Sequence, residues 1–356
     1  MNHKMHHQHE SSCHTKKGKV DYILWGSLLA VAALYTAYWQ VPEQFADIKW
    51  LTILSESVFD LMNTIWWGVT IGIIMVAVLS KVPREFVISI LGDGGGLRGI
   101  IRACLGGVLL DLCSHGILMV GAKLYERGAS IGQIMAFLVA SPWNSFSLTL
   151  VLIALIGLPW TLGFIAFSMG IAIITGLIFD RLVKRGTLPS NPNKTDLPEG
   201  FRFWPEAKKG LSNTKYTKEF LWEMARDGLF ESRMVIRWIL FGVFLAGLVR
   251  AFVDADSFQT YFGPTLAGLG LTVLVATIME VCSEGSTPIA ADILTRAKAP
   301  GNSFAFLMTG VSTDYTEIMI LKDTTKSWKI AFFLPLITLP QVIGIAWLIN
   351  LATVGG

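Results

Sequence analysis

The stretch Asp111–Gly116 reads Asp-Leu-Cys-Ser-His-Gly, and Glu280–Gly285 reads Glu-Val-Cys-Ser-Glu-Gly, 169 positions later. Aligned without a gap, residues 111–138 and 280–307 share nine identical residues. Weaker similarity continues upstream, so each copy is a unit of roughly 130 residues, far longer than a solenoid repeat. A duplication on this scale predicts a transporter built from two repeats.

The composition places the chain in a membrane. Of its 356 residues, 53% are hydrophobic and 15% are charged, and its mean hydropathy is +0.55, whereas about 25% of a soluble domain is charged. The net charge of +3 is small and the basic residues cluster in loops, which favours a lipid bilayer rather than nucleic acid as the partner. Metalloprotease, hydrolase and Walker motifs are absent from the sequence, so we expect neither an enzyme nor a cofactor.

Residues 1–20 hold five of the six histidines and predict a cytoplasmic arm. Imidazole and thiol groups at this density can bind Zn, Cu or Ni ions. The alternatives are a plain polar tail or a remnant of an expression tag. The candidate metal ligands are His3, His6, His7, His9, Cys13 and His14.

Two apolar runs follow the arm. The run Tyr22–Gln40 is long enough to cross a bilayer as a helix and lacks the features of a cleaved signal peptide. A second span is expected over about 58–79, and the basic residues Lys81 and Arg84 place its end in the cytoplasm. The glycine-rich residues 92–99 lack a phosphate-binding motif and predict a flexible turn.

Each copy of the repeated stretch lies between two short apolar helices. These are expected at about 100–112 and 117–127, and again at 265–281 and 287–297. None of them is long enough to span alone, so each pair predicts a re-entrant hairpin. The segment Gly285–Pro288 is typical of a helix start, which would direct free N–H groups and a positive dipole end at the tip.

A broken span is expected after each hairpin. The first covers about 131–157 and is interrupted by the polar residues 141–145, which include Pro142. The second covers about 302–321, and its break is expected at 309–314. Unbroken spans are expected at about 158–180, 230–252 and 330–350.

Three spans per repeat force the two copies into opposite orientations, which the lysine and arginine bias of the loops also favours. We therefore predict an all-α integral membrane protein with two inverted repeats, about seven spans and two hairpins. If the hairpin helices cross the membrane fully, the count rises to nine or more. The predicted parts are the arm (1–20), an N-terminal span (21–50), repeat 1 (51–183), a cytoplasmic linker (184–228) and repeat 2 (229–356).

In inverted-repeat transporters the substrate site lies near the midplane, where half-helices end. The hairpin tips and the helix breaks are the candidates here. A bound anion, a thiolate or a neutral oxyacid would suit such a site. The predicted substrate-binding residues are Cys113, Ser114, His115, Asn144, Cys282, Ser283, Glu284, Ser286, Thr313 and Asp314.

Ionisable residues within membrane segments are costly and point to function. Asp111 and Glu280 occupy equivalent positions, and with Glu284 they are predicted to carry a coupled proton. His115 and Asp314 could also take part. The alternative is that these carboxylates lie at an interface or pair with Arg102, Arg127 or Arg296.

The cysteines also leave two interpretations open. Beside a helix N-terminus Cys113 and Cys282 would favour the thiolate form and act as soft ligands, but membrane cysteines often only pack. Packing is expected for Cys104, whose equivalent in the second repeat is Val273.

The chain resembles the predicted permease family that includes the organoarsenical efflux permeases. Members carry in each half a cysteine-containing turn, a helix with a basic residue, an Ala-Phe-Leu sequence and a polar helix break. Many members have Cys-Glu-Cys-Gly and then a proline in the first turn, where this chain has His115 and Met119. The matching stretches here are Cys113–Gly116, Arg127, Ala136–Leu138 and Ser141–Asn144, then Cys282–Gly285, Arg296, Ala305–Leu307 and Ser312–Asp314.

The resemblance implies a secondary permease that exports a thiol-reactive species such as a trivalent organoarsenical. In the absence of an ATPase motif, we expect proton-coupled efflux of a metalloid, an organoarsenical or a soft metal across a bacterial-type inner membrane. The alternative is an exporter of a small anion or organic solute recognised at the two hairpin tips. Either function is compatible with a homo-oligomer.

Overall fold

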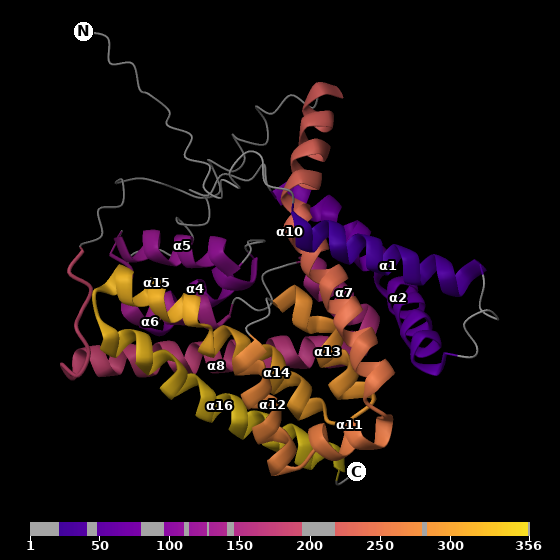
Figure 1. Cartoon of the computed structure of the whole chain (residues 1–356). Helices are drawn as coiled ribbons and strands as arrows, with labels where there is room; N and C mark the ends of the chain where they lie inside the picture. The colour runs from indigo at the N-terminus through magenta and orange to yellow at the C-terminus, as the bar shows by residue number, and fades with distance from the viewer. Residues whose placement is uncertain are drawn as a thin grey trace.

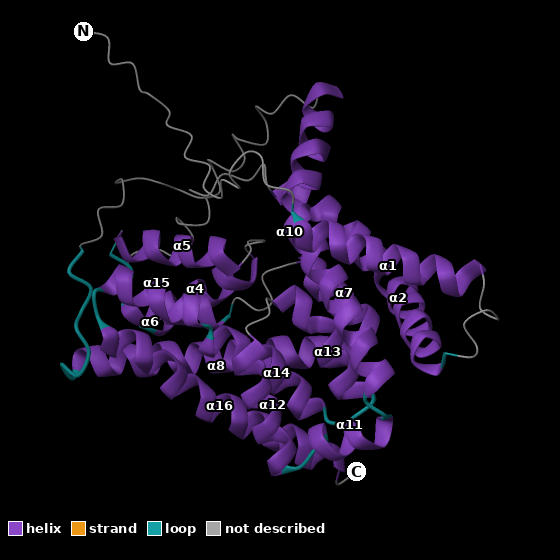
Figure 2. Ribbon diagram, viewed as in Figure 1, coloured by secondary structure: helices purple, strands orange, loops and turns teal. Residues whose placement is uncertain are grey.

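The computed structural model describes residues 21–40, 48–79, 96–109, 114–126, 128–140, 146–193, 218–279 and 283–354. Within these ranges every regular element is a helix (Figures 1 and 2), which confirms the all-α prediction. The helices are α1 (Tyr22–Gln40), α2 (Lys49–Leu79), α4 (Leu97–Leu109), α5 (Ser114–Glu126), α6 (Ile131–Val139), α7 (Phe146–Ile156), α8 (Leu158–Lys184), α10 (Lys218–Phe252), α11 (Ala255–Phe262), α12 (Leu266–Met279), α13 (Ser283–Thr295), α14 (Pro300–Thr313), α15 (Tyr315–Thr325) and α16 (Trp328–Val354).

Three described helices are each long and apolar enough to cross a membrane: α1, α8 and α16. They coincide with three of the predicted spans. A fourth crossing is obtained if α10 and α11, which meet at a bend of 109°, count as one span. The count of seven spans stays a prediction.

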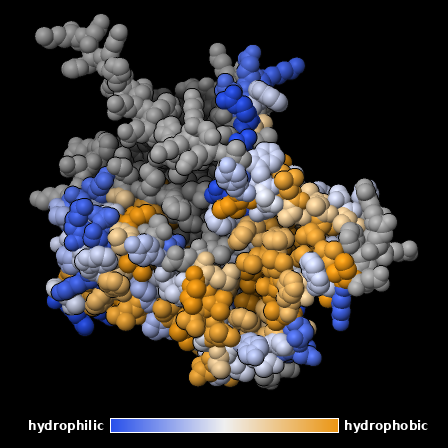
Figure 3. All heavy atoms as spheres, viewed as in Figure 1, coloured by the Kyte–Doolittle hydropathy of each residue, from blue (hydrophilic) through white to orange (hydrophobic). Residues whose placement is uncertain are grey.

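The surface of these helices suits lipid. Large apolar side chains point outward from α8, α12 and α16, and Figure 3 shows apolar residues gathered over the lower part of the molecule. Contiguous apolar surface of this kind marks a membrane contact rather than a soluble face. Examples are Leu158, Leu162, Ile174, Leu274, Ile278, Phe332, Leu336 and Leu348.

A short turn separates α10 from α11. Asp254 caps α11, since its Oδ2 accepts a hydrogen bond of 2.9 Å from the Ser257 backbone N–H. This bond lowers the pKa of the exposed Asp254 carboxyl below its usual value. The cap allows the chain to reverse sharply ahead of the second hairpin.

The four helices predicted to form the hairpins are short, as expected, although their bounds differ from the predicted ones by up to four residues. The pairs α4/α5 and α12/α13 consist of helices of 13 or 14 residues. At 1.5 Å per residue each extends about 20 Å, well short of a hydrocarbon core about 30 Å thick. None of these helices crosses a bilayer alone.

The start predicted for the last hairpin helix is wrong. α13 begins at Ser283, so Pro288 is not in the first turn but inside the helix. Proline has no N–H, so the Glu284 carbonyl lacks its helical partner. Residues 285–293 are all buried, and their packing outweighs this local cost.

Both predicted breaks separate helices. α6 ends at Val139 and α7 begins at Phe146, while residues 141–145 lie outside the described residues. In the second half α14 continues through Thr313, and Asp314 alone interrupts it, with an extended ψ of 123°. The second break is therefore narrower than the predicted 309–314.

The first helix after the predicted linker starts early. α10 begins at Lys218, so it reaches into the segment 184–228. In Figure 1 its first turns stand clear of the other described helices. α8 ends at Lys184. The chain that follows it contacts the end of α5, because Asn191 Nδ2 donates to the Tyr125 and Ala129 carbonyls at 2.7 and 2.8 Å.

The same helix pairs pack together in each half. α6 packs against both α4 and α8, and α14 packs against both α12 and α16. The Gly132 N–H donates to Asp180 Oδ1 at 2.9 Å, and the Gly301 N–H donates to Asn350 Oδ1 at 2.8 Å. Both contacts join the start of the central helix to the last long helix of its half.

The two halves share one core. The rings of Phe164 on α8 and Phe304 on α14 are 5.4 Å apart. Ser168 Oγ lies 3.1 Å from Met308 Sδ. Gln341 Nε2 on α16 donates to Thr175 Oγ1 on α8 at 3.0 Å. Apolar packing and a few polar contacts therefore hold the halves together.

Candidate functional site

One helix of each predicted hairpin lies against the opposite half of the chain. Helix α5 of the first hairpin contacts α15, and α13 of the second hairpin contacts α7 (Figure 1). Helices α7 and α15 are the ones that follow the two breaks. The tertiary structure therefore brings together the two features, hairpins and breaks, that the sequence indicated as site elements.

Most of the predicted site residues lie outside the described residues. Ser114 and His115 begin α5, and Ser283 and Glu284 begin α13, but their side chains are also outside the description. The residues wholly outside it are Asp111, Cys113, Asn144, Glu280, Cys282 and the arm residues His3, His6, His7, His9, Cys13 and His14.

The start of α13 lies directly on α10. A Cβ atom on Gly242 would overlap the Gly285 carbonyl oxygen, so only glycine allows the backbones to approach this closely. Ser286 and Thr287, in the next positions of α13, are 7% and 1% exposed. The second hairpin tip is therefore held against a rigid helix.

Thr313 and Asp314 lie together at the second break. The Thr313 hydroxyl donates to the Thr309 carbonyl at 2.9 Å. The Asp314 N–H donates to the Gly310 carbonyl at 3.1 Å, and its own carbonyl accepts from Ile318 N–H at 3.1 Å. Asp314 thus ends α14 and directly precedes α15.

Two buried ionisable residues and one half-buried arginine were missed by reasoning from the sequence. Glu317 on α15 is 3% exposed, and Asp292 on α13 is 1% exposed. Arg250 lies near the end of α10. Each is a charged side chain in a predicted apolar helix, and that signal alone could have found them.

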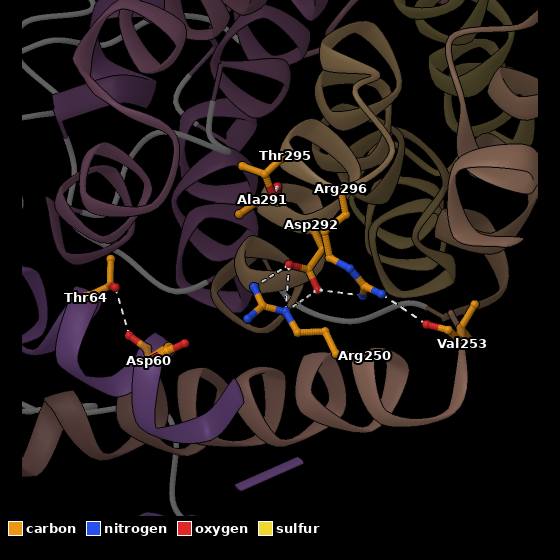
Figure 4. Close-up of polar contacts among 8 residues, drawn as sticks. All are labelled: Asp60, Thr64, Arg250, Val253, Ala291, Asp292, Thr295 and Arg296. Carbon is orange, nitrogen blue, oxygen red and sulfur yellow. Dashed lines mark hydrogen bonds and ion pairs between the residues drawn. The ribbon is translucent and has the colours of Figure 1, made fainter. Parts of the chain in front are cut away.

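Asp292 is held by two arginines (Figure 4). Arg250 Nε lies 3.0 Å from both carboxylate oxygens, and its Nη2 also contacts Oδ1. Arg296 Nη1 lies 3.7 Å from Oδ2, while its Nη2 donates to the Val253 carbonyl at 3.0 Å. The sequence predicted Arg296 as a possible partner for the hairpin carboxylates. In the structure it forms an ion pair with Asp292 instead.

This cluster joins the second hairpin to α10. The Arg296 guanidinium also lies 5.0 Å from the centre of the Phe258 ring on α11, a distance typical of a cation–π contact. The buried Asp292 carboxylate therefore links α13 to α10, and Arg296 links the same cluster to α11. Such an arrangement fixes the hairpin's position but leaves no free group on Asp292 for a substrate.

Among the described residues, no group of three or more histidine, cysteine, aspartate or glutamate side chains could hold a metal ion. Cys104 is fully buried on α4, with Sγ 3.9 Å from the Met169 carbonyl oxygen. Its predicted packing role is confirmed.

A family model described as a predicted permease (ArsP_1) matches residues 50–349. The chain is 22% identical to UPF0718 protein MJ0584 of Methanocaldococcus jannaschii over 74% of this chain and 85% of that protein. It is 23% identical to UPF0718 protein YcgR of Bacillus subtilis over 78% and 90%.

A third relative comes from Streptococcus mutans and is named "Putative two-component membrane permease complex subunit". It is 22% identical over 62% of this chain and 70% of its own length. No solved structure is significantly similar to the chain. The family match covers both predicted hairpins and both breaks. It also covers all or nearly all of each described helix, with the exception of α1, which lies outside it. The chain therefore belongs to the predicted permease family of membrane transporters.

Proposed function

We propose that the protein is a secondary permease that exports a thiophilic metalloid, an organoarsenical or a soft metal species in exchange for protons. The observation that carries this proposal is the position of the two helix starts. α5 begins at Ser114 and α13 at Ser283, so Cys113 and Cys282 each directly precede a short helix. The positive end of a helix dipole stabilises a thiolate, and thiolates are soft ligands for trivalent arsenic.

The proposed architecture is an inverted repeat with seven spans and two hairpins. It is supported by the matching Gly132–Asp180 and Gly301–Asn350 contacts and by the reciprocal packing of α5 on α15 and of α13 on α7. In this arrangement the arm and the linker are cytoplasmic, and the protein lies in a bacterial-type inner membrane. Asp111, Glu280 and Glu284 are proposed to carry coupled protons.

The proposed substrate path runs between the hairpin tips and the helix breaks. His115, Asn144, Ser286, Thr313 and Asp314 would supply its polar lining. The histidine-rich arm would concentrate soft metal ions at the cytoplasmic entrance. A homo-oligomer or a two-subunit complex is compatible with this path, because the path lies within one chain.

Export of a small anion or organic solute is the second candidate function. It is favoured by the helix starts at both tips, since free N–H groups at a helix N-terminus bind anions without a thiolate. The two candidates differ in whether the cysteine sulfur is needed.

Replacing Cys113 or Cys282 with serine separates these functions. For a thiophilic substrate we expect methylarsenite transport into proteoliposomes to fall about 10-fold or more. Losing a residue that only supports a metal ligand typically lowers affinity or activity by about 10-fold or more, and losing the ligand itself should lower it at least as much. Cys104→Ala is the matched control, since this cysteine is fully buried and its Sγ contacts the Met169 carbonyl on α8. Wild-type transport in both serine variants would favour the anion exporter.

The seven-span arrangement predicts that the C-terminus lies outside the cell. In a background without other cysteines, Gly355→Cys should react with an impermeant maleimide added to intact cells, and a cysteine placed in the linker at Lys208 should react only after lysis. The three spans of each repeat are the reason, because an odd number places successive termini on opposite faces. Labelling of position 355 from the cytoplasmic face alone would contradict the inverted repeat.

A further inference from the structure

Glu317 is a buried carboxylic acid to which the proposed site gives no role. It lies in the first turn of α15, directly after the second break. Glu317 is 3% exposed, and its Oε2 atom accepts no hydrogen bond. A carboxylate anion in such a position is very costly, whereas the neutral acid is much less so. The position therefore disfavours a permanently charged Glu317.

Among the residues that the structure describes, the helices packed against α15 supply no positively charged partner for Glu317. α14 contains no titratable side chain, and α16 has only Lys329, at its start. Asp314 is the described charge that acts on Glu317, and it has the same sign. The titratable residues of α5, the remaining neighbour, are His115, Lys123, Tyr125 and Glu126, of which Tyr125 is buried and Glu126 is exposed.

The fold itself does not need an acid at this position. The equivalent residue in the first half is Leu148, on α7, which is 2% exposed. Leucine therefore packs well in the corresponding place after the other break. Packing therefore does not explain why position 317 has a carboxyl group. A chemical role for this group explains it better.

Unpaired buried oxygen atoms occur near both breaks. Thr309 Oγ1, one turn before Asp314, and Ser147 Oγ, at the start of α7, are fully buried and have no hydrogen-bond partner. Buried polar atoms without partners are rare and call for water, an ion or a ligand. Buried polar atoms that can bind water, an ion or a ligand therefore lie near both breaks, within an otherwise apolar core.

We propose that Glu317 carries one of the protons that this permease exchanges for substrate, in addition to those assigned to Asp111, Glu280 and Glu284. The inference rests on the proposed function, since it assigns the coupling step of the same transporter. A proton from the external side binds Oε2 and gives the neutral acid. When the break is exposed to the cytoplasm, the O–H bond breaks, the proton leaves to water and the carboxylate remains. Substrate moves in the opposite direction between these two states.

Glutamine at position 317 imitates the neutral acid and cannot release a proton. In proteoliposomes that contain Glu317→Gln, we expect methylarsenite exchange at equal pH to stay within about two-fold of wild type. Accumulation driven by an imposed pH gradient should fall to the level seen without a gradient. Glu317→Asp should restore part of the accumulation, because the titrating group returns.

Two further variants control for folding and for charge. Glu317→Leu should fold and insert, because Leu148 occupies the equivalent position. Asp323→Asn alters an exposed carboxylate on the same helix, paired with Lys322 at 2.7 Å, and should keep wild-type coupling. Gradient-driven accumulation in Glu317→Gln that matches wild type would overturn the proposal. Equal loss of exchange and accumulation in a folded Glu317→Gln protein would also overturn it, because that result indicates a role in binding.

Infrared difference spectroscopy gives a measurement that needs no substrate. Titration of the reconstituted wild type should show the C=O stretch of a protonated carboxylic acid that disappears at high pH, and Glu317→Gln should lack this band. Absence of the band in wild type would overturn the proposal. If the band is present while wild type moves no methylarsenite, the proton site is supported and the proposed substrate is wrong.

Discussion

Replacing Asp292 with alanine is expected to destabilise the protein by about 3–5 kcal/mol, the cost typical of breaking a buried ion pair. The carboxylate is 1% exposed and is the partner of Arg250 and Arg296. Its removal leaves two partly buried guanidinium groups without a counter-charge. The second hairpin should then separate from α10, and transport should be lost with stability.

The measurement is unfolding of the reconstituted protein by a denaturant, followed by tryptophan fluorescence. Arg250→Ala should show a loss of similar size, and the double variant should lose much less than the sum, because each change already breaks the same pair. Asp323→Ala is the control. That residue pairs with Lys322 on the surface, where an ion pair adds little. Additive losses for Asp292 and Arg250 would show that the two residues act independently.

Gly301→Ala is expected to produce the second large effect. A Cβ atom at this position would overlap the Ala346 carbonyl oxygen and crowd the Asn350 side chain. The first of these is backbone, so α14 and α16 must move apart. The hydrogen bond of 2.8 Å from Gly301 N–H to Asn350 should break as well. We expect a loss at or above the upper end of the about 1–3 kcal/mol typical of overpacking.

Two other glycine variants test this explanation. Gly132→Ala should behave in the same way, because its Cβ would overlap the Gly176 carbonyl oxygen and Asp180. Gly344 lies on α16 with open space around it, so Gly344→Ala should be neutral or stabilise by about 0.5–1 kcal/mol. Denaturant unfolding of all three variants supplies the comparison. Equal stability of Gly301→Ala and Gly344→Ala would contradict the close approach of α14 and α16.

Local patterns in the sequence were sufficient for the identity of the helices. Apolar runs, prolines and glycines predicted α1, α8 and α16, the two hairpin pairs and both breaks. These features depend on residues within one or two turns of each other, and helix formation in a membrane is itself a local event. The repeated cysteine turn also indicated the permease family before any tertiary contact was known.

The start of α13 shows where local reasoning failed. Pro288 favours a helix beginning nearby, but the helix begins at Ser283 because residues 285–293 are buried against other helices. The close approach of Gly285 to Gly242 on α10 cannot be read from either segment alone. Packing energy between distant segments outweighed the local preference.

The sequence by itself determined that this chain is a helical membrane permease, and it predicts two cysteine-bearing hairpins. Only the tertiary structure decided that α5 packs on α15, that α13 packs on α7, and that Arg250 and Arg296 share Asp292. It also decided that Glu317 is buried without a partner for Oε2. The physical reason is that burial and ion pairing depend on which helices meet, and those contacts join residues far apart in the chain.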